Sequence, residues 1–138
     1  MEEGLEKIIY KDLSYKITGW LFKTHQQLGR YKNEKQYGDY LEQLFKDEQL
    51  NYAREYKLIE PVLSNKIIRC KVDFLIDDKI ILELKAKPFI TREDYYQTKR
   101  YLNTLNLKLA ILVNFRQYRL APKRILNSNY SQHSLNNS

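Results

Sequence analysis

The chain contains little of what disulfide-linked, zinc-clustered or membrane-spanning proteins require. Its single cysteine, Cys70, excludes an intrachain disulfide and a cysteine-based zinc cluster. No apolar run approaches the roughly 18 residues of a membrane-spanning helix, and the first residues lack the apolar core of a signal peptide. We therefore expect a cytoplasmic protein.

Acidic residues are outnumbered, because 24 Lys and Arg against 17 Asp and Glu give a formal net charge of +7. This balance favours an anionic partner such as nucleic acid, although it is also compatible with solubility alone. A length of 138 residues with 43% hydrophobic residues fits one globular domain. The 12 tyrosines could stack on bases, but their spread over every expected element favours packing at the edge of the core.

Hydrophobic periodicity predicts an alternation of helices and strands. Gly19 within the first helix indicates close packing, and Thr91 with Asp94 resembles a capping box. Residues 1–127 would form one domain and the Asn- and Ser-rich residues 128–138 a disordered tail. The expected helices cover residues 6–28, 34–49 and 91–104, and the expected strands cover 52–63, a hairpin over 70–85, 107–115 and an edge strand within 116–127.

The predicted hairpin carries charges where burial should exclude them. Val72 and every second residue after it form a core face, whereas the opposite face mixes aliphatic residues with Asp73, Glu83 and Lys85. Charges on a half-buried face are costly unless they are paired or bound to a metal. Because E-x-K patterns are common on strands, spacing alone favours a structural ion pair.

The turn of the hairpin decides whether the two carboxylates meet. A two-residue turn at 77–78 would place Asp73 opposite Leu82. A three-residue loop at 77–79 would instead place Asp73 opposite Glu83. We predict the three-residue loop or a bulge.

Two carboxylates placed in this way would have their Cβ atoms about 5 Å apart. Such a pair can hold Mg²⁺, which keeps waters or substrate phosphate oxygens as its other ligands. Lys85 would orient the attacking water or offset charge on the phosphate. The pattern is therefore compatible with hydrolysis of a phosphodiester.

The order helix, helix, strand, hairpin with Asp then Glu-x-Lys, helix, strand resembles the core of the PD-(D/E)XK nuclease superfamily, and more closely its small GxxExxF family, over about residues 5–127. The glycine of the GxxExxF name falls on Tyr31 here, and Val72 replaces the proline of the superfamily name. The matching segments are residues 24–29, 34–37, 71–74, 82–86, 97–101 and 112–115.

The resemblance implies an α/β nuclease-like fold in which a central mixed β-sheet of about five strands is flanked by about three helices. It places Asp73, Glu83 and Lys85 at the metal-binding and catalytic positions. It also implies that Glu34 completes the metal site, to which the backbone carbonyl of Leu84 would contribute.

A second element that the resemblance implies is Q-x-x-x-Y, formed here by Gln97 and Tyr101, which would contact substrate or position Lys85. His25 matches a histidine of the family pattern to which no role is carried over.

The expected function is a Mg²⁺- or Mn²⁺-dependent nuclease that acts on nucleic acid, with DNA preferred over RNA. The alternative is a non-catalytic module on a nuclease fold that binds nucleic acid or a protein. Because so small a chain offers little surface for grasping a long duplex, we also expect a homodimer or a larger complex.

Overall fold

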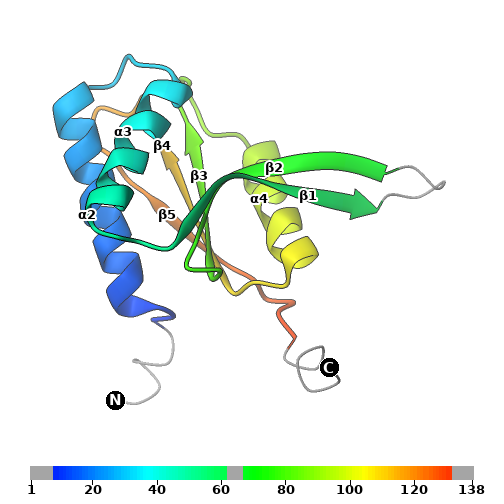
Figure 1. Cartoon of the computed structure of the whole chain (residues 1–138). Coiled ribbons are helices and arrows are strands. Elements are labelled where there is room, and N and C mark those ends of the chain that lie inside the picture. The colour runs from blue at the N-terminus through cyan, green and yellow to red at the C-terminus, as the bar shows by residue number, and fades with distance from the viewer. Residues whose placement is uncertain (1–7, 62–66, 132–138) are drawn as a thin grey trace.

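The computed structural model describes residues 8–61 and 67–131, which form a five-stranded mixed sheet with helices on both faces (Figure 1). Residues 1–7, 62–66 and 132–138 lie outside the described part, and with them parts of the predicted first helix, first strand and tail. The described elements are α2 (Lys11–Leu28), α3 (Glu34–Asp47), β1 (Tyr52–Pro61), β2 (Ile67–Ile76), β3 (Ile80–Lys85), α4 (Arg92–Leu105), β4 (Leu109–Asn114) and β5 (Lys123–Leu126).

The strands lie in the order β1-β2-β3-β4-β5. The first three form an antiparallel meander, β4 returns parallel to β3 after the α4 crossover, and β5 pairs antiparallel with β4. The predicted mixed sheet and the crossover through the third predicted helix are therefore confirmed.

Two apolar layers hold the helices against the sheet. Helices α2 and α3 cover one face, where Leu21 and Phe45 pack with Phe74 and Leu82 of the hairpin. Helix α4 covers the other face, where Leu102 joins a separate cluster of buried residues. Every residue of β4 is buried, as expected for a strand covered on both sides. Burial of each large aliphatic side chain contributes about 2 kcal/mol.

The helices begin where side chains can cap them. Asn33 and Gln36 form a capping box at the start of α3, and Thr91 and Asp94 form the predicted one at the start of α4. Each cap stabilises its helix by about 1 kcal/mol. Helix α2 starts at Lys11, later than predicted, because Tyr10 adopts the left-handed conformation with φ 54° and interrupts the helical path.

Gly19 and Asn106 have surroundings that the sequence does not indicate. Gly19 does not mark close packing within the protein, because an added Cβ there would meet no atom within 4 Å. Asn106 exchanges two hydrogen bonds with the backbone of Ser131, so the described start of the predicted tail contacts the end of α4. None of the helices in the described ranges is long and apolar enough to cross a membrane.

Candidate active site

The turn between β2 and β3 has the length that the site requires. Ile76 pairs with Ile80, so residues 77–79 form the predicted three-residue loop. The regular pairing of the two strands runs only as far as Phe74 and Leu82. Continuing the same register by one residue places Asp73 across from its predicted partner, Glu83.

The two carboxylates take the place of the next backbone rung between β2 and β3. The Asp73 amide donates a hydrogen bond of 2.8 Å to Glu83 Oε1, and the Leu84 amide donates one of 2.7 Å to Asp73 Oδ2. Each side chain therefore satisfies a backbone N–H of the opposite strand. This reciprocal arrangement, called here the carboxylate rung, fixes both acids at the point where the strands separate.

The strands separate because the part of β2 that precedes Asp73 pairs with β1 and no longer with β3. Figure 1 shows β1 and β2 continuing as a two-stranded arm past α4. The predicted alternation of β2 fails here: Phe74 faces α2 and α3, whereas Val72 packs in the α4 cluster with Leu75. Opposite Asp73, Glu55 of β1 has a φ of 51°, which is unusual within a strand.

Burial acts on both acids of the rung, and the charge of Asp73 acts on Glu83. Glu83 is only 4% exposed, and burial together with the charge of Asp73 raises its pKa to about 8. Burial also raises the pKa of Asp73. The positive charge of Lys85 and the two backbone hydrogen bonds lower both pKa values without offsetting this increase. Both acids therefore bind a proton more tightly than they would in water.

Lys85 at the end of β3 points toward the start of α4. Its ammonium lies 3.8 Å from Asp94 Oδ1, and Lys87 lies 2.6 Å from Asp94 Oδ2. The hydrogen bond from Lys87 and the bonds from Thr91 lower the pKa of Asp94 despite its burial, so it stays ionised. Sequence reasoning missed this anchoring role for Asp94. The sequence indicates only its role in the helix cap, because its contacts with the two lysines depend on where the connector places α4.

Glu34 begins α3 and reaches toward the same strand end. Its carboxylate accepts a hydrogen bond from the backbone of Ala86, and burial raises its pKa. It interacts electrostatically with both Asp73 and Lys85. Helix α3 therefore places Glu34 beside the carboxylate rung, where it lines the same cleft as Asp73.

The predicted Q-x-x-x-Y pair lies on α4. Tyr101 is buried in the α4 cluster, and its pKa is raised by burial and by the charge of Glu83. Gln97 lies one turn earlier and is half-buried. His25 lies elsewhere: its ring hydrogen-bonds to the Gln117 carbonyl at 2.9 Å and lies 6.3 Å from the ring of Phe115, which is a structural role.

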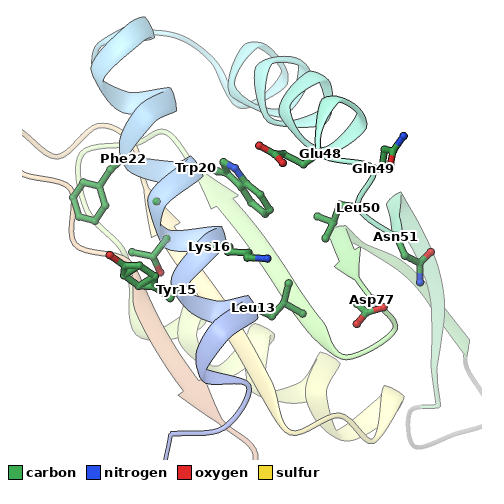
Figure 2. Close-up of a pocket in the computed structure, with 12 residues that line it drawn as sticks. Leu13, Tyr15, Lys16, Trp20, Phe22, Glu48, Gln49, Leu50, Asn51 and Asp77 are labelled. Carbon is green, nitrogen blue, oxygen red and sulfur yellow. The ribbon is translucent and has the colours of Figure 1, made fainter.

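A cleft of about 540 Å³ opens beside the rung and is lined by Glu34, Asp73, Leu84 and Arg54 among others. A larger hollow of about 830 Å³ lies between α2 and the α3–β1 connection (Figure 2). Trp20 and Leu50 of that hollow provide apolar surface, and its lining includes no residue of the rung. The cleft lined by Glu34 and Asp73, and not the larger hollow, is therefore the one that adjoins the carboxylate rung.

The donor set fits a hard divalent cation. Within residues 8–61 and 67–131, no three His, Cys, Asp or Glu side chains are grouped so as to hold an ion by themselves. Mg²⁺ needs only one or two carboxylates and takes its other ligands from water or substrate. The buried carboxylate of Glu83 and the half-buried carboxylate of Asp73, both with raised pKa values, match that requirement, and Asp73 and Leu84 line the cleft.

Comparison with known proteins agrees with this fold. The chain is similar to a solved structure described as "Crystal structure of SSO0001", with 23% identity, a TM-score of 0.54, and coverage of 65% of this chain and 48% of that one. The match thus spans about half the length of that protein and concerns the fold. No curated protein matches the chain at a significant level. The family model described as "PD-(D/E)XK nuclease superfamily" matches residues 11–125. With its five-stranded mixed sheet and three described helices, the chain belongs to the PD-(D/E)XK nuclease superfamily.

Proposed function

We propose that the protein is a divalent-metal-dependent nuclease that hydrolyses phosphodiester bonds of nucleic acid, with DNA favoured over RNA. One observation carries the proposal: the carboxylate rung joins buried Glu83 and half-buried Asp73, both with raised pKa values, beside a cleft and within electrostatic reach of Lys85. Within residues 8–61 and 67–131 neither acid forms an ion pair, and the nearby charge of Lys85 does not offset the rise of either pKa, so the pair does not resemble a compensated structural salt bridge.

Asp73 and Glu83 would hold Mg²⁺ or Mn²⁺, with the Leu84 carbonyl and Glu34 as further ligands, directly or through water. Such an ion, when bound, polarises a phosphoryl oxygen and acidifies a bound water. The net charge of +7 would favour approach of the anionic substrate.

Lys85 would hold the attacking water in position or offset the negative charge that develops on the phosphate. Its 3.8 Å contact with Asp94 restricts the direction of its side chain and supports a positioned role. Gln97 and Tyr101 on α4 would position the substrate or Lys85, because Tyr101 lies close enough to Glu83 to sense its charge.

A non-catalytic nucleic-acid-binding or protein-binding module is the second candidate. The observation that favours it is that both acids of the rung already accept backbone hydrogen bonds, while Lys87 and Lys85 contact Asp94. Such a network could persist as a structural device without catalysis.

Cleavage assays with matched variants separate the two functions. Purified protein is incubated with single-stranded and duplex DNA and RNA in Mg²⁺, in Mn²⁺ and in EDTA. The nuclease proposal requires metal-dependent cleavage that is lost in Asp73→Ala and Lys85→Ala while nucleic acid still binds. Asp12→Ala and Lys23→Ala, which alter exposed residues of α2, are the matched controls and should cleave normally. Protein inert on every substrate with both metals would favour the binding module.

The finer assignments stay predictions. A structure soaked with Mn²⁺ tests the ligand set, since density between Asp73 and Glu83 is required. Light scattering tests the homodimer or larger complex, and cell fractionation tests the cytoplasmic location. Membership of the narrower GxxExxF family is likewise a prediction, which an alignment of close homologues would test at the positions of Tyr31 and Glu34.

A further inference from the structure

Two loops meet at one end of the sheet and bring together two arginines and two tyrosines. Arg30 and Tyr31 lie in the α2–α3 connection, and Arg116 and Tyr118 lie in the turn after β4. Arg30 Nε donates a hydrogen bond of 2.8 Å to the Arg116 carbonyl, which joins the loops directly. These four residues are called here the Arg–Tyr platform.

The guanidinium groups of the platform lie over its aromatic rings. The Arg30 guanidinium carbon is 5.1 Å from the ring centroid of Tyr31 and 5.8 Å from that of Tyr118. The Arg116 guanidinium carbon is 5.6 Å from the centroid of Tyr31. Despite these contacts, Tyr31 and Tyr118 remain 74% and 77% exposed. Each ring therefore contacts an arginine and still presents most of its surface to solvent.

The backbone beneath the platform is held in place from several directions. The Tyr37 hydroxyl donates to the Gly29 carbonyl at 2.6 Å and accepts from the Lys32 amide at 3.2 Å, which fixes the first loop. The ring of Tyr37 stacks on Phe115 at 4.1 Å. His25 bonds to the Gln117 carbonyl and fixes the second loop. A rigid support lowers the entropic cost of binding a ligand to the exposed rings.

Acidic residues in the described part of the chain do not neutralise the positive charge of the platform. Within the described ranges, neither Arg30 nor Arg116 takes part in an ion pair. Arg116 Nε and the neighbouring Gln117 Oε1 are also buried without a hydrogen-bond partner in the described part of the chain. Buried polar atoms without partners are uncommon, and a bound ligand is one way to satisfy them. The two guanidinium charges without an acidic partner in the described ranges favour an anionic ligand.

The platform borders the candidate active site through Ala86. Arg116 Nη2 donates to the Ala86 carbonyl at 3.3 Å, and the backbone of Ala86 also hydrogen-bonds to Glu34. Lys85 immediately precedes this residue. A nucleic-acid strand bound to the platform would therefore lie close to Glu34 and Lys85.

We propose that the Arg–Tyr platform binds single-stranded nucleic acid, with unpaired bases stacked on Tyr31 and Tyr118 and phosphates held by Arg30 and Arg116. The chemistry supports an unpaired strand because a base can stack on a ring only when its face is free, and every base has such a face. Duplex ends would be bound only where they fray. This inference rests on the proposed nuclease function for its biological sense but makes a separate claim about binding.

The test measures binding without cleavage. Fluorescence anisotropy is recorded in EDTA with labelled oligothymidylate and oligouridylate of 12 nucleotides and with a blunt-ended DNA duplex of 12 base pairs. Wild-type protein should bind the single strands more tightly than the duplex. Stacking contributes about 1–3 kcal/mol per base, so the variant Tyr31→Ala/Tyr118→Ala should bind single strands at least tenfold more weakly. The ratio of the two single-strand affinities identifies DNA or RNA as the preferred source.

Two controls keep the result interpretable. Tyr15→Ala removes a tyrosine of α2 that is equally exposed, at 76%, and should leave binding unchanged. Tyr31→Phe/Tyr118→Phe retains the rings and should bind within about twofold of wild type, since stacking does not need the hydroxyl. Thermal melts of all variants verify folding.

The outcomes separate this proposal from the nuclease proposal. Equal affinity of the double alanine variant and Tyr15→Ala, tighter binding of the duplex, or no binding of any oligonucleotide would overturn the platform, whatever the cleavage assay gives. Loss of single-strand binding in the double alanine variant supports the platform even if the wild type cleaves nothing.

Discussion

Replacing Glu83 by glutamine should stabilise the metal-free protein while removing its response to metal. The side chain is 4% exposed and its pKa is raised to about 8 by burial and by Asp73. A folded-state pKa above the unfolded value means that the folded protein binds this proton more tightly. Stability is therefore highest below the unfolded pKa of about 4.5 and declines as the pH rises toward 8.

The size of the effect follows from that window. Each unit of pKa difference corresponds to about 1.4 kcal/mol, so ionising Glu83 between pH 5 and pH 8 costs up to about 4 kcal/mol. Glutamine has nearly the same shape, still offers an oxygen to the Asp73 amide, and never ionises. We expect Glu83→Gln to be more stable than wild type by about 2–4 kcal/mol at pH 8 and by little at pH 5. That difference corresponds to an increase in Tm of roughly 10 °C at pH 8.

Thermal unfolding of both proteins from pH 5 to pH 8 measures the effect, first in EDTA and then with Mg²⁺ or Mn²⁺. Wild-type protein should gain stability with metal at pH 8, whereas Glu83→Gln should gain little. Asp12→Asn, an exposed acid in the first turn of α2, is the control and should follow wild type at every pH. If Glu83→Gln is less stable than wild type at pH 8 in EDTA, Glu83 is a stabilising ion-pair member and the argument from repulsion is wrong.

Further changes test the neighbours of the rung. Asp94→Asn should lower cleavage at least tenfold, because Lys85 and Lys87 lose their shared anion; a Lys23→Ala variant, altering an exposed lysine of α2, should retain activity. Since the pKa of Asp94 is lowered, the stability that it contributes is present above its usual value near 4 and is lost as the pH falls below it, so in a denaturant titration from pH 6 to pH 3 the Asn variant should show a shallower loss. His25→Ala should lower the free energy of unfolding by about 1–2 kcal/mol through loss of its bond to the Gln117 carbonyl, and an unchanged urea midpoint would contradict the structural role. Nucleic-acid affinity should fall steeply between roughly 50 and 200 mM salt, and a flat salt dependence would exclude phosphate contacts as the main source of binding.

Much of the fold is predictable from the sequence because its signals are local. The strand over β4 is an unbroken apolar run, and the start of α4 follows from Thr91 and Asp94, whose capping box depends on residues three apart. The hairpin register follows from the loop length, which fixes Ile76 opposite Ile80. These features need no knowledge of distant parts of the chain.

The parts that could not be predicted depend on contacts between distant segments. Strict alternation assigns Val72 to the same face as Phe74, yet the divergence of the β1–β2 arm turns Val72 to the α4 side. Periodicity also predicts that the first helix begins at residue 6, whereas α2 begins at Lys11, directly after Tyr10 in the left-handed conformation. Hydrophobic spacing reveals neither the twist of a two-stranded arm nor a single residue with positive φ.

The candidate site shows the same division. The acids of the rung and Lys85 stand out as charges on an apolar hairpin, but Asp94 was assigned only to its helix cap. Its contacts with Lys85 and Lys87 depend on where the connector directs α4. The Arg–Tyr platform joins residues 30 and 116, which are separated by 86 positions in the chain, and two scattered tyrosines among 12 carry no local signal.

The capping box of α4 also makes the connector between β3 and α4 a spacer of fixed length. Asp94 must be the third residue of the helix to accept the bond from the Thr91 amide, and it must also meet Lys87 on the strand side. One added residue between Lys87 and Thr91 would leave the cap intact but rotate and displace the helix relative to the sheet. Insertions that most surface loops tolerate should therefore be harmful in these few positions, where the start of a helix and the direction of a lysine are set by one carboxylate.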